Sequence, residues 1–459
     1  MTRDTKFGKF IKRIFLMKTS SLYTLLFLFM AAFSVSAQSS YSLEQAIQYA
    51  QDQNKEIKLS QLAIEDADAQ ILEYWAIGIP KLNGSLEYNH FIQIPQTVVP
   101  AEIFGGPAGE FTELQLGVAN TVNGQLTLSA LLFDGGFFVG LKAQEMYKEL
   151  KRRELIQTEQ QVRFNVTKAY LNVLVAEQSL EILQKNIDNL KANLQEAEAN
   201  YEAGFIENLD VDRIRLSLQT LQTEYDAANG NAWLARNLLK FQMNYPINDS
   251  IEVKGDLESL FPEAQAMDVN YNDQVNYDDR IEYRIAQKGL ELSQVDVKRL
   301  RAGYLPTITA FMNHSQQLQR QNLFKDDIPW IPSTLVGAQL QLPIFDGLDR
   351  KAKIQRAKIR REESLQQIEQ LESGISMEVT NARVQFDNAQ KRLTNTKNNL
   401  DLSERIYERT QEKFDEGLGS SLEVKSAESD FYQSQNAYVR ALYDLLIAYT
   451  DLQNAIGKI

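Results

Sequence analysis

The chain has 459 residues, a formal net charge of −13, no cysteine and only two histidines. Without cysteine there is no disulfide framework, thiolate zinc site, iron–sulfur cluster or cysteine nucleophile, and nothing to carry the N-terminal lipid of a bacterial lipoprotein. The acidic balance argues against a nucleic-acid partner, because binding phosphates requires clustered Lys and Arg.

The N-terminus has the pattern of an export signal. After Met17, Lys18 supplies a positive start, an apolar stretch covers residues 22–33, and the Val-Ser-Ala at 35–37 fits a small-residue cleavage site. We therefore expect residues 1–37 to be a signal peptide with an N-terminal extension. A membrane anchor is the alternative, but the apolar run is short for a bilayer span.

Two long segments, 108–245 and 344–459, contain no proline, and residues 141–203 also lack glycine. Since these two residue types are the main helix breakers, the composition predicts an uninterrupted helix over 141–203. At about 1.5 Å per residue this helix would be roughly 95 Å long. Such a length is typical of a coiled coil or a helical tunnel.

The apolar residues in this segment recur every 3.5 residues, which is the period of a coiled-coil seam. The seam residues are Leu180, Leu183, Ile187, Leu190, Leu194, Ala197 and Tyr201. After a glycine turn at 204–208 the pattern resumes at Ile214, Leu218, Leu221, Tyr225 and Ala228. We therefore expect two antiparallel helices that share a seam and meet at the turn.

The same arrangement occurs twice. The turn YEAG at 201–204 returns 213 residues later as FDEG, and the LDV that follows it returns as LEV. Internal similarity of this kind indicates one structural unit used twice. We predict repeat 1 over 38–245 and repeat 2 over 280–459, each with a helix, two strands, a long helix and a second helix. An acidic linker over 246–279 would join them.

Apolar and polar residues alternate along the strands between the helices. The predicted polar face carries Asn83, Ser85, Glu87, Asn123, Gln125, Thr127, Gln339 and Gln341. Strands of this kind suit a transmembrane barrel with a wet lumen, and a soluble two-sided sheet is the alternative. Two strands per repeat give four per chain, too few to close a barrel, and an open sheet edge cannot face lipid. Several chains must therefore share one barrel, with the helices extending from its rim as a second, α-helical tube.

These features together resemble the TolC family of outer-membrane efflux channels. The most specific pieces are the paired turns, YEAGFIENLDV and KFDEGLGSSLEV, and the segments GIPKL and GYLPTI before a strand of each repeat. The resemblance implies a mainly α-helical homotrimer with a twelve-stranded barrel in the outer membrane of a Gram-negative bacterium and a long periplasmic α-barrel. It also implies a passive conduit that works with a periplasmic adaptor protein and an inner-membrane transporter, for efflux or type I secretion.

The resemblance also implies a gate at the glycine turns. The tip that meets the adaptor would comprise Gly204, Leu209, Val211, Gly417, Leu422 and Val424. The family's acidic constriction ring would fall on Glu423 and on Ser426, which is not acidic, so we expect half of that ring. Three copies of Glu423 would disfavour anions at a narrow mouth, although a merely solvated Glu423 is the alternative.

The family's gate-closing contacts would fall on Asp210 and on Phe414, where the family has tyrosine. Because phenylalanine has no hydroxyl, we expect other contacts to hold the gate closed, with Arg213 and Lys425 as candidates.

Two classes of function remain open at this point. The prediction is the outer-membrane conduit, and the alternative is a periplasmic or surface coiled-coil scaffold without channel activity. The strands favour the conduit, because a scaffold has no use for four amphipathic strands of membrane length. We expect no enzyme, metal or cofactor, since no nucleophile elbow or phosphate-binding loop accompanies the two histidines.

Overall fold

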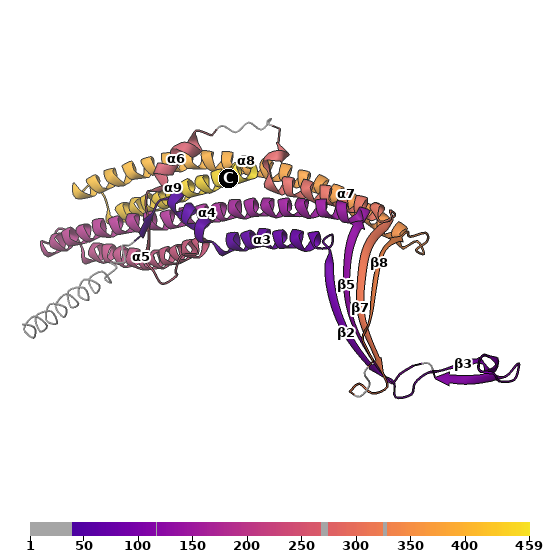
Figure 1. The fold of residues 1–459 in the computed structure, drawn as a ribbon. Helices are drawn as coiled ribbons and strands as arrows, with labels where there is room; N and C mark the ends of the chain where they lie inside the picture. Colours follow the sequence, from indigo (N-terminus) through magenta and orange to yellow (C-terminus); the bar gives the residue numbers. More distant parts are fainter. Residues whose placement is uncertain (1–38, 116, 268–273, 325–327) are drawn as a thin grey trace, which may run out of the picture.

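A computed structural model describes residues 39–115, 117–267, 274–324 and 328–459. The predicted signal peptide lies outside these ranges. Figure 1 shows a bundle of long helices with a four-stranded sheet at one end and the two helical turns at the other. No helix in the described ranges is both long and apolar enough to cross a membrane.

Two helices dominate the bundle. α4 (Gly135–Glu202) has 68 residues and α8 (Asp349–Asp415) has 67, so each is about 100 Å long. The other α-helices are α2 (Leu43–Gln53), α3 (Lys55–Trp75), α5 (Asn208–Met243), α6 (Leu257–Gln265), α7 (Ile281–Ala302) and α9 (Ser421–Ala455). α4 packs against α3 near the sheet and against α5 further away, and α8 packs against α7 and α9 in the same way. The predicted long helix and its repeat are confirmed.

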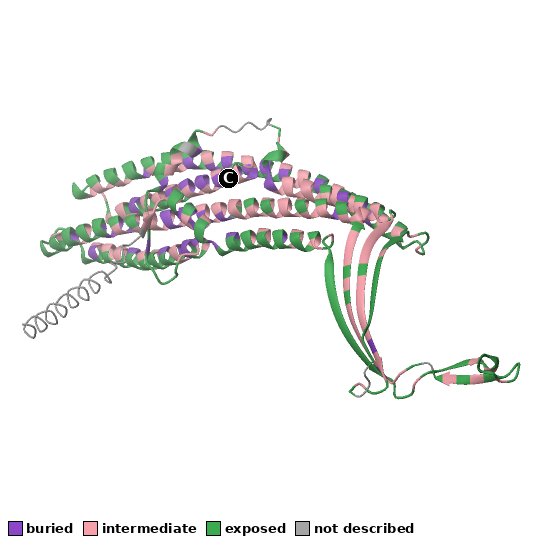
Figure 2. Cartoon of the chain, in the orientation of Figure 1, coloured by how far each residue is buried: buried purple, intermediate pink, exposed green. Residues whose placement is uncertain are grey.

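Apolar burial is concentrated in the middle of the bundle, where α2, α4, α5, α8 and α9 come together with the linker. Its largest fully buried side chains include Tyr170, Leu239, Met243, Phe386 and Leu445. Figure 2 shows the same distribution, with buried residues along the helices and mostly exposed or half-buried residues in the sheet. The helical bundle therefore holds the chain together, while the sheet in a single chain has no core of its own.

A second apolar cluster lies between α4 and α5, on the way to their turn. It contains Leu183, Ile187 and Leu190 from α4 and Leu221 from α5. This part of the predicted seam is confirmed. The prediction that Tyr201 continues the seam is wrong, because its side chain is 45% exposed in the last turn of α4, where the two helices diverge into the turn.

The four long strands form one antiparallel sheet in the order β2-β5-β7-β8. Their bounds are β2 (Lys81–His90), β5 (Asn120–Phe133), β7 (Thr307–Arg320) and β8 (Ile331–Gln341). The two strands of repeat 1 thus lie beside the two strands of repeat 2. Both outer strands, β2 and β8, have one edge that pairs with no other strand in the described ranges.

Several short elements lie in segments that the sequence suggested were loops or linker. The loop after β2 contains a hairpin of β3 (Gln96–Pro100) and β4 (Phe111–Gln115), joined by the 3-10 helix η1 (Ala101–Phe104). The linker contains β6 (Ile251–Val253), which pairs in parallel with β1 (Ser39–Tyr41), and the 3-10 helix η2 (Tyr277–Asp279). The hydroxyl of Tyr170 on α4 shares its single proton between the carbonyls of Tyr41 in β1 and of Lys254 just after β6, which ties the pair of strands to the bundle.

Candidate functional site

The two turns at the end of the bundle are built on glycine. Gly204 has φ +79° and Gly417 has φ +75°, in the left-handed region that other residues rarely adopt. Each turn is closed by backbone hydrogen bonds that satisfy the last carbonyls of α4 or α8, such as that from the amide of Leu418 to the carbonyl of Lys413 at 2.8 Å. The long helices can therefore reverse direction within about five residues.

The predicted tip residues divide into two groups. Leu209 and Leu422 are exposed, whereas Val211 is buried and Val424 is half-buried against the neighbouring helices. Sequence reasoning missed Phe205 and Leu418, which directly follow the two glycines and are 80% and 77% exposed. The sequence does give a signal for these two residues, because each is a large apolar residue directly after the glycine of a repeated turn.

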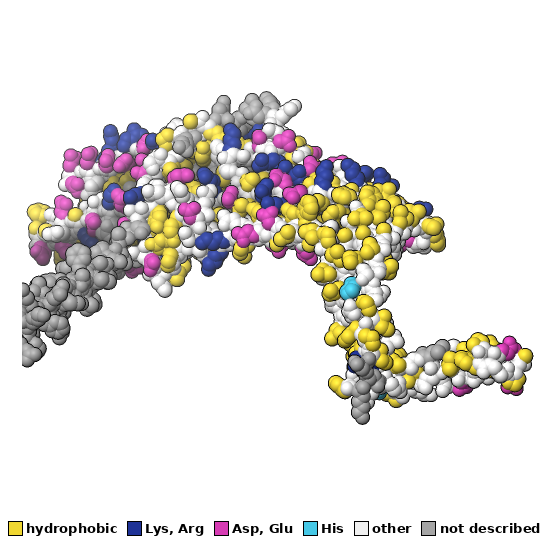
Figure 3. All heavy atoms as spheres, viewed as in Figure 1, with side chains coloured by type: hydrophobic (Ala, Val, Ile, Leu, Met, Phe, Trp, Pro, Cys, Tyr) yellow, Lys and Arg dark blue, Asp and Glu magenta, His cyan; other side chains and the backbone are white. Residues whose placement is uncertain are grey.

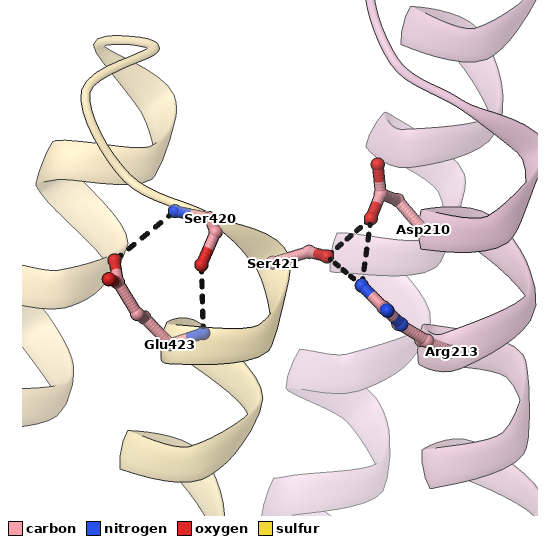
Figure 4. A network of polar contacts seen from close by, with 5 residues as sticks. All are labelled: Asp210, Arg213, Ser420, Ser421 and Glu423. Atoms are coloured by element: carbon pink, nitrogen blue, oxygen red, sulfur yellow. Dashed lines mark hydrogen bonds and ion pairs between the residues drawn. The ribbon is translucent and has the colours of Figure 1, made fainter.

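A polar contact joins the two helical hairpins near the turns (Figure 4). The hydroxyl of Ser421 on α9 donates to the carboxylate Oδ1 of Asp210 on α5. Arg213, one turn further along α5, donates from Nη1 to Ser421 Oγ at 3.0 Å and to Asp210 Oδ1 at 3.4 Å. All three side chains are half-buried. The sequence therefore identified Asp210 and Arg213 as candidates, and the structure adds Ser421 as the residue that links them to the other hairpin.

Glu423 has a different environment from that of Asp210. Its carboxylate accepts a hydrogen bond from the amide of Ser420 at 3.2 Å, and the Ser420 hydroxyl accepts one from the Glu423 amide at 3.3 Å. This reciprocal pair is a capping box at the start of α9. Glu423 and Ser426 are both exposed, and neither belongs to the contact between the hairpins.

A cavity of about 70 Å³ lies between the two hairpins, next to this polar contact. Its lining includes Phe414 from α8 and Arg213 from α5, together with apolar residues of α4. Phe414 is half-buried, and a Cβ atom at Gly419 would lie 3.3 Å from its backbone nitrogen. Phe414 thus contributes an aromatic ring without a hydroxyl to the cavity wall.

The cavity also contains a buried acid that sequence reasoning missed. Glu428 on α9 is only 7% exposed, and the hydroxyl of Tyr432 donates to its Oε1 at 3.1 Å. Burial raises the pKa of the Glu428 carboxyl, and this effect outweighs the opposing hydrogen bond from Tyr432 and the attraction of Lys425. An acid on a helix with mixed apolar and polar neighbours gave no sign of burial in the sequence.

The strands place all eight predicted polar-face residues on one face of the sheet. Residues directly opposite each other in antiparallel strands share a face, and Ser85, Gln125 and Ser315 form one such row. The remaining pairings are Asn83 with Thr127, Glu87 with Asn123, Thr309 with Gln339 and Thr307 with Gln341. Rows of the other face, such as Leu82, Leu128, Met312 and Val336, are apolar. The strand register therefore brings the predicted polar residues to one face of the sheet and these apolar residues to the other.

Neither histidine lies in a metal-binding cluster. His314 is on the apolar face and its Nδ1 is 2.8 Å from Thr334 Oγ1, while His90 Nδ1 is 2.8 Å from Asn120 Oδ1. Among the residues that the structure describes, no group of three or more His, Asp or Glu side chains could hold a metal ion.

Comparisons with known proteins agree with this architecture. The sequence profile described as outer membrane efflux protein matches residues 46–244 and 282–458. The probable outer membrane lipoprotein SilC of Salmonella typhimurium is 21% identical over 88% of this chain and 83% of its own length. The outer membrane efflux protein BepC of Brucella suis is 22% identical over 72% of this chain and 71% of its own. The crystal structure of CusC superposes with a TM-score of 0.73 at 17% identity, covering 90% of this chain and 92% of that one.

Proposed function

This chain belongs to the outer membrane efflux protein family, and from that premise we propose that it is the passive exit duct of a tripartite efflux or type I secretion system. The duct would lead from the periplasm through the outer membrane of a Gram-negative bacterium. In this proposal a periplasmic adaptor protein and an inner-membrane transporter supply the cargo and the energy. The chain is a channel subunit and not an enzyme.

The observation that carries the proposal is the four-stranded sheet with one apolar face, one polar face and two unpaired edges. Apolar side chains such as Leu86 on β2 and Val336 on β8 are more than 70% exposed in the single chain. Lipid can cover such side chains, but it cannot satisfy the backbone groups of an open edge. If β8 of one chain pairs with β2 of the next, three copies close a twelve-stranded barrel, within the known range of outer-membrane barrels.

In this homotrimer the polar face lines the lumen. The rows of Asn, Ser, Thr, Gln and Glu side chains on β2 and β5 would then be the wall of a wet pore. The helices would continue the same tube through the periplasm. Apolar side chains that are exposed in the single chain support this assembly, because α5 carries Trp233 and Phe241 and α8 carries Met377 and Ile406. Packing α5 of one protomer against α8 of the next would remove these side chains from water.

We assign the gate to the glycine turns. The turn residues Leu209 and Leu422 would be apolar contacts for the adaptor, together with the backbone around Gly204 and Gly417. Contacts at Asp210 and packing of Phe414 in the cavity would hold the closed tip. Three Glu423 side chains around the axis would make the mouth selective for cations, with Ser426 contributing no charge.

Planar bilayer recording tests the proposal. Purified protein should insert and give channels that prefer cations, and Glu423→Gln should weaken their block by a trivalent cation on the tip side. Glu416→Gln, which neutralises an exposed acid in the turn between α8 and α9, serves as the matched charge control. A protein that stays out of the bilayer and gives no conductance would support the scaffold alternative. Channels whose block is unchanged in Glu423→Gln would retain the duct and remove the acidic ring.

A further inference from the structure

Positive charge gathers at one place in this acidic chain. The first 13 residues of α8, 349–361, contain seven Lys or Arg residues and a single acid, Asp349, although the whole chain carries −13. The last turns of α7 add Lys298, Arg299 and Arg301. Figure 3 shows these dark blue side chains over the helices, beside a broad apolar zone where the helices meet the sheet. The cluster therefore lies at the rim between the two parts of the molecule.

α7 and α8 bring these charges together. The guanidinium of Arg350 lies 5.8 Å from the centre of the Tyr304 ring, just after the end of α7, and the two helices pack along their length. α7 ends five residues before β7 begins, and α8 begins eight residues after the end of β8. At about 1.5 Å per residue, Lys358 is roughly 13 Å along α8 from its start. All of these cations are thus within about three helical turns of the strands.

Some of the cations are neutralised within the chain and some are not. Arg299, Arg350 and Lys353 form ion pairs with acids on their own helix or next to it. Lys298, Arg301, Lys351 and Lys358 are exposed and form no ion pair with any residue that the structure describes. We refer to these four residues as the basic collar.

The basic collar lies on the linker face of the helices. Arg301 is 18 residues after Tyr283, and Lys358 is 18 residues before Ser376, which is five full helical turns in each case. The rings of Tyr277 and Tyr283 are 5.6 Å apart, and the hydroxyls of Tyr277 and Ser376 are 2.8 Å apart, so both helical faces contact Tyr277 of the linker. The linker would obstruct the tunnel if this face pointed inward. The basic collar therefore faces outward in the proposed duct.

Exposed apolar residues separate the basic collar from the strands. Ile344 and Phe345 are 91% and 82% exposed, and Leu342, Leu348 and Leu305 are about half exposed. Along the chain the order is the apolar face of β8, this apolar segment, and then Lys351 and Lys358. The same order of environments occurs across a bilayer leaflet: hydrocarbon, interface, then phosphate.

We propose that the basic collar binds the phosphates of anionic phospholipids in the periplasmic leaflet of the outer membrane, an inference that rests on the proposed function. Ammonium and guanidinium groups complement a phosphodiester, and the apolar segment beside them fits the first methylenes of the acyl chains. In a homotrimer the four residues give twelve cations around the rim. They anchor the duct at a fixed depth and favour phosphatidylglycerol over phosphatidylethanolamine.

Native mass spectrometry of the purified, detergent-solubilised protein tests this proposal. Titrated phosphatidylglycerol should bind more tightly than phosphatidylethanolamine, and salt should reduce the difference. Since one cation near a lipid surface contributes about fivefold in affinity, Arg301→Gln/Lys351→Gln/Lys358→Gln should weaken phosphatidylglycerol binding about 100-fold. The control, Lys185→Gln/Lys191→Gln/Lys397→Gln, removes the same charge from the coiled coil and should bind like the wild type.

The outcomes separate the two proposals. A three-chain species whose phosphatidylglycerol binding is unchanged in the triple variant would overturn the basic collar and leave the duct intact. If the triple variant lost binding of lipid A and kept binding of phosphatidylglycerol, the basic collar would face the outer leaflet, and this result would also overturn the proposal. A wild-type protein with no three-chain species in detergent would contradict the proposed duct itself.

Discussion

From the contact between the hairpins we predict that loss of the Ser421 hydroxyl makes the tip open more often. Ser421→Ala removes the group that joins Asp210 and Arg213 to α9. Hydrogen bonds to charged groups contribute about 1.5–3 kcal/mol, and exposed ion pairs about 0–1. Since the side chains of Asp210 and Arg213 are 22% and 35% exposed, we expect about 1 kcal/mol per chain. If the tips of the three chains in the proposed homotrimer open together, the closed state loses about 3 kcal/mol of stability. This corresponds to a roughly 100-fold decrease in the ratio of closed to open channels.

Single-channel recording measures this ratio directly. Ser421→Ala should raise the ratio of open time to closed time by about 100-fold without changing the conductance of the open channel. Ser434→Ala is the matched control, because its hydroxyl donates only within α9, to the carbonyl of Asp430. A ratio of open to closed time for Ser421→Ala within twofold of the wild type, in protein with normal thermal stability, would refute the role of this contact in closing the tip.

Three further predictions concern the bundle. Because burial raises the pKa of the Glu428 carboxyl, the stability that its protonated form contributes is complete at low pH and is lost as pH rises through the raised pKa. The melting temperature of the wild type should therefore fall between acid and neutral pH. Glu428→Gln, which cannot ionise, should reduce this fall in melting temperature. Phe386→Ala should cost about 3–5 kcal/mol in chemical denaturation, because the ring is fully buried, whereas Phe205→Ala in the exposed turn should cost almost nothing. Tyr170→Phe should leave the Lys254 carbonyl without its side-chain donor, since the Tyr41 carbonyl still accepts from the Lys254 amide, and should expose the short parallel strands to proteolysis. The Tyr170 hydroxyl, with a pKa raised to about 12, should stay protonated at neutral pH.

The sequence predicts the long elements of this fold because each has a period that spans many residues. The coiled-coil seam on α4 extends from Leu180 to Ala197, and the alternation on β5 extends over nine residues, so isolated exceptions such as Tyr201 do not obscure either pattern. The short elements have no comparable pattern. β1 and β6 have three residues each, and the β3–β4 hairpin lies among prolines and glycines that are typical of a loop.

The tip was predictable only in part. The capping role of Glu423 could have been read from the Ser-x-x-Glu spacing that starts at Ser420, a signal that sequence reasoning did not use. The partner of Asp210 could not be predicted, since Ser421 is 211 residues away and pairs with it only when the hairpins lie side by side. The burial of Glu428 likewise depends on packing of α9 against the neighbouring helices, which spacing along one helix does not reveal.

The most direct test of the duct is the detergent-corrected mass of the native protein extracted from the outer membrane, measured by light scattering. The sheet with two unpaired edges predicts a mass of three chains, because three copies of four strands close one barrel. A monomer or dimer recovered in the soluble fraction would contradict the shared barrel, and with it the assignment of the polar strand face to a pore.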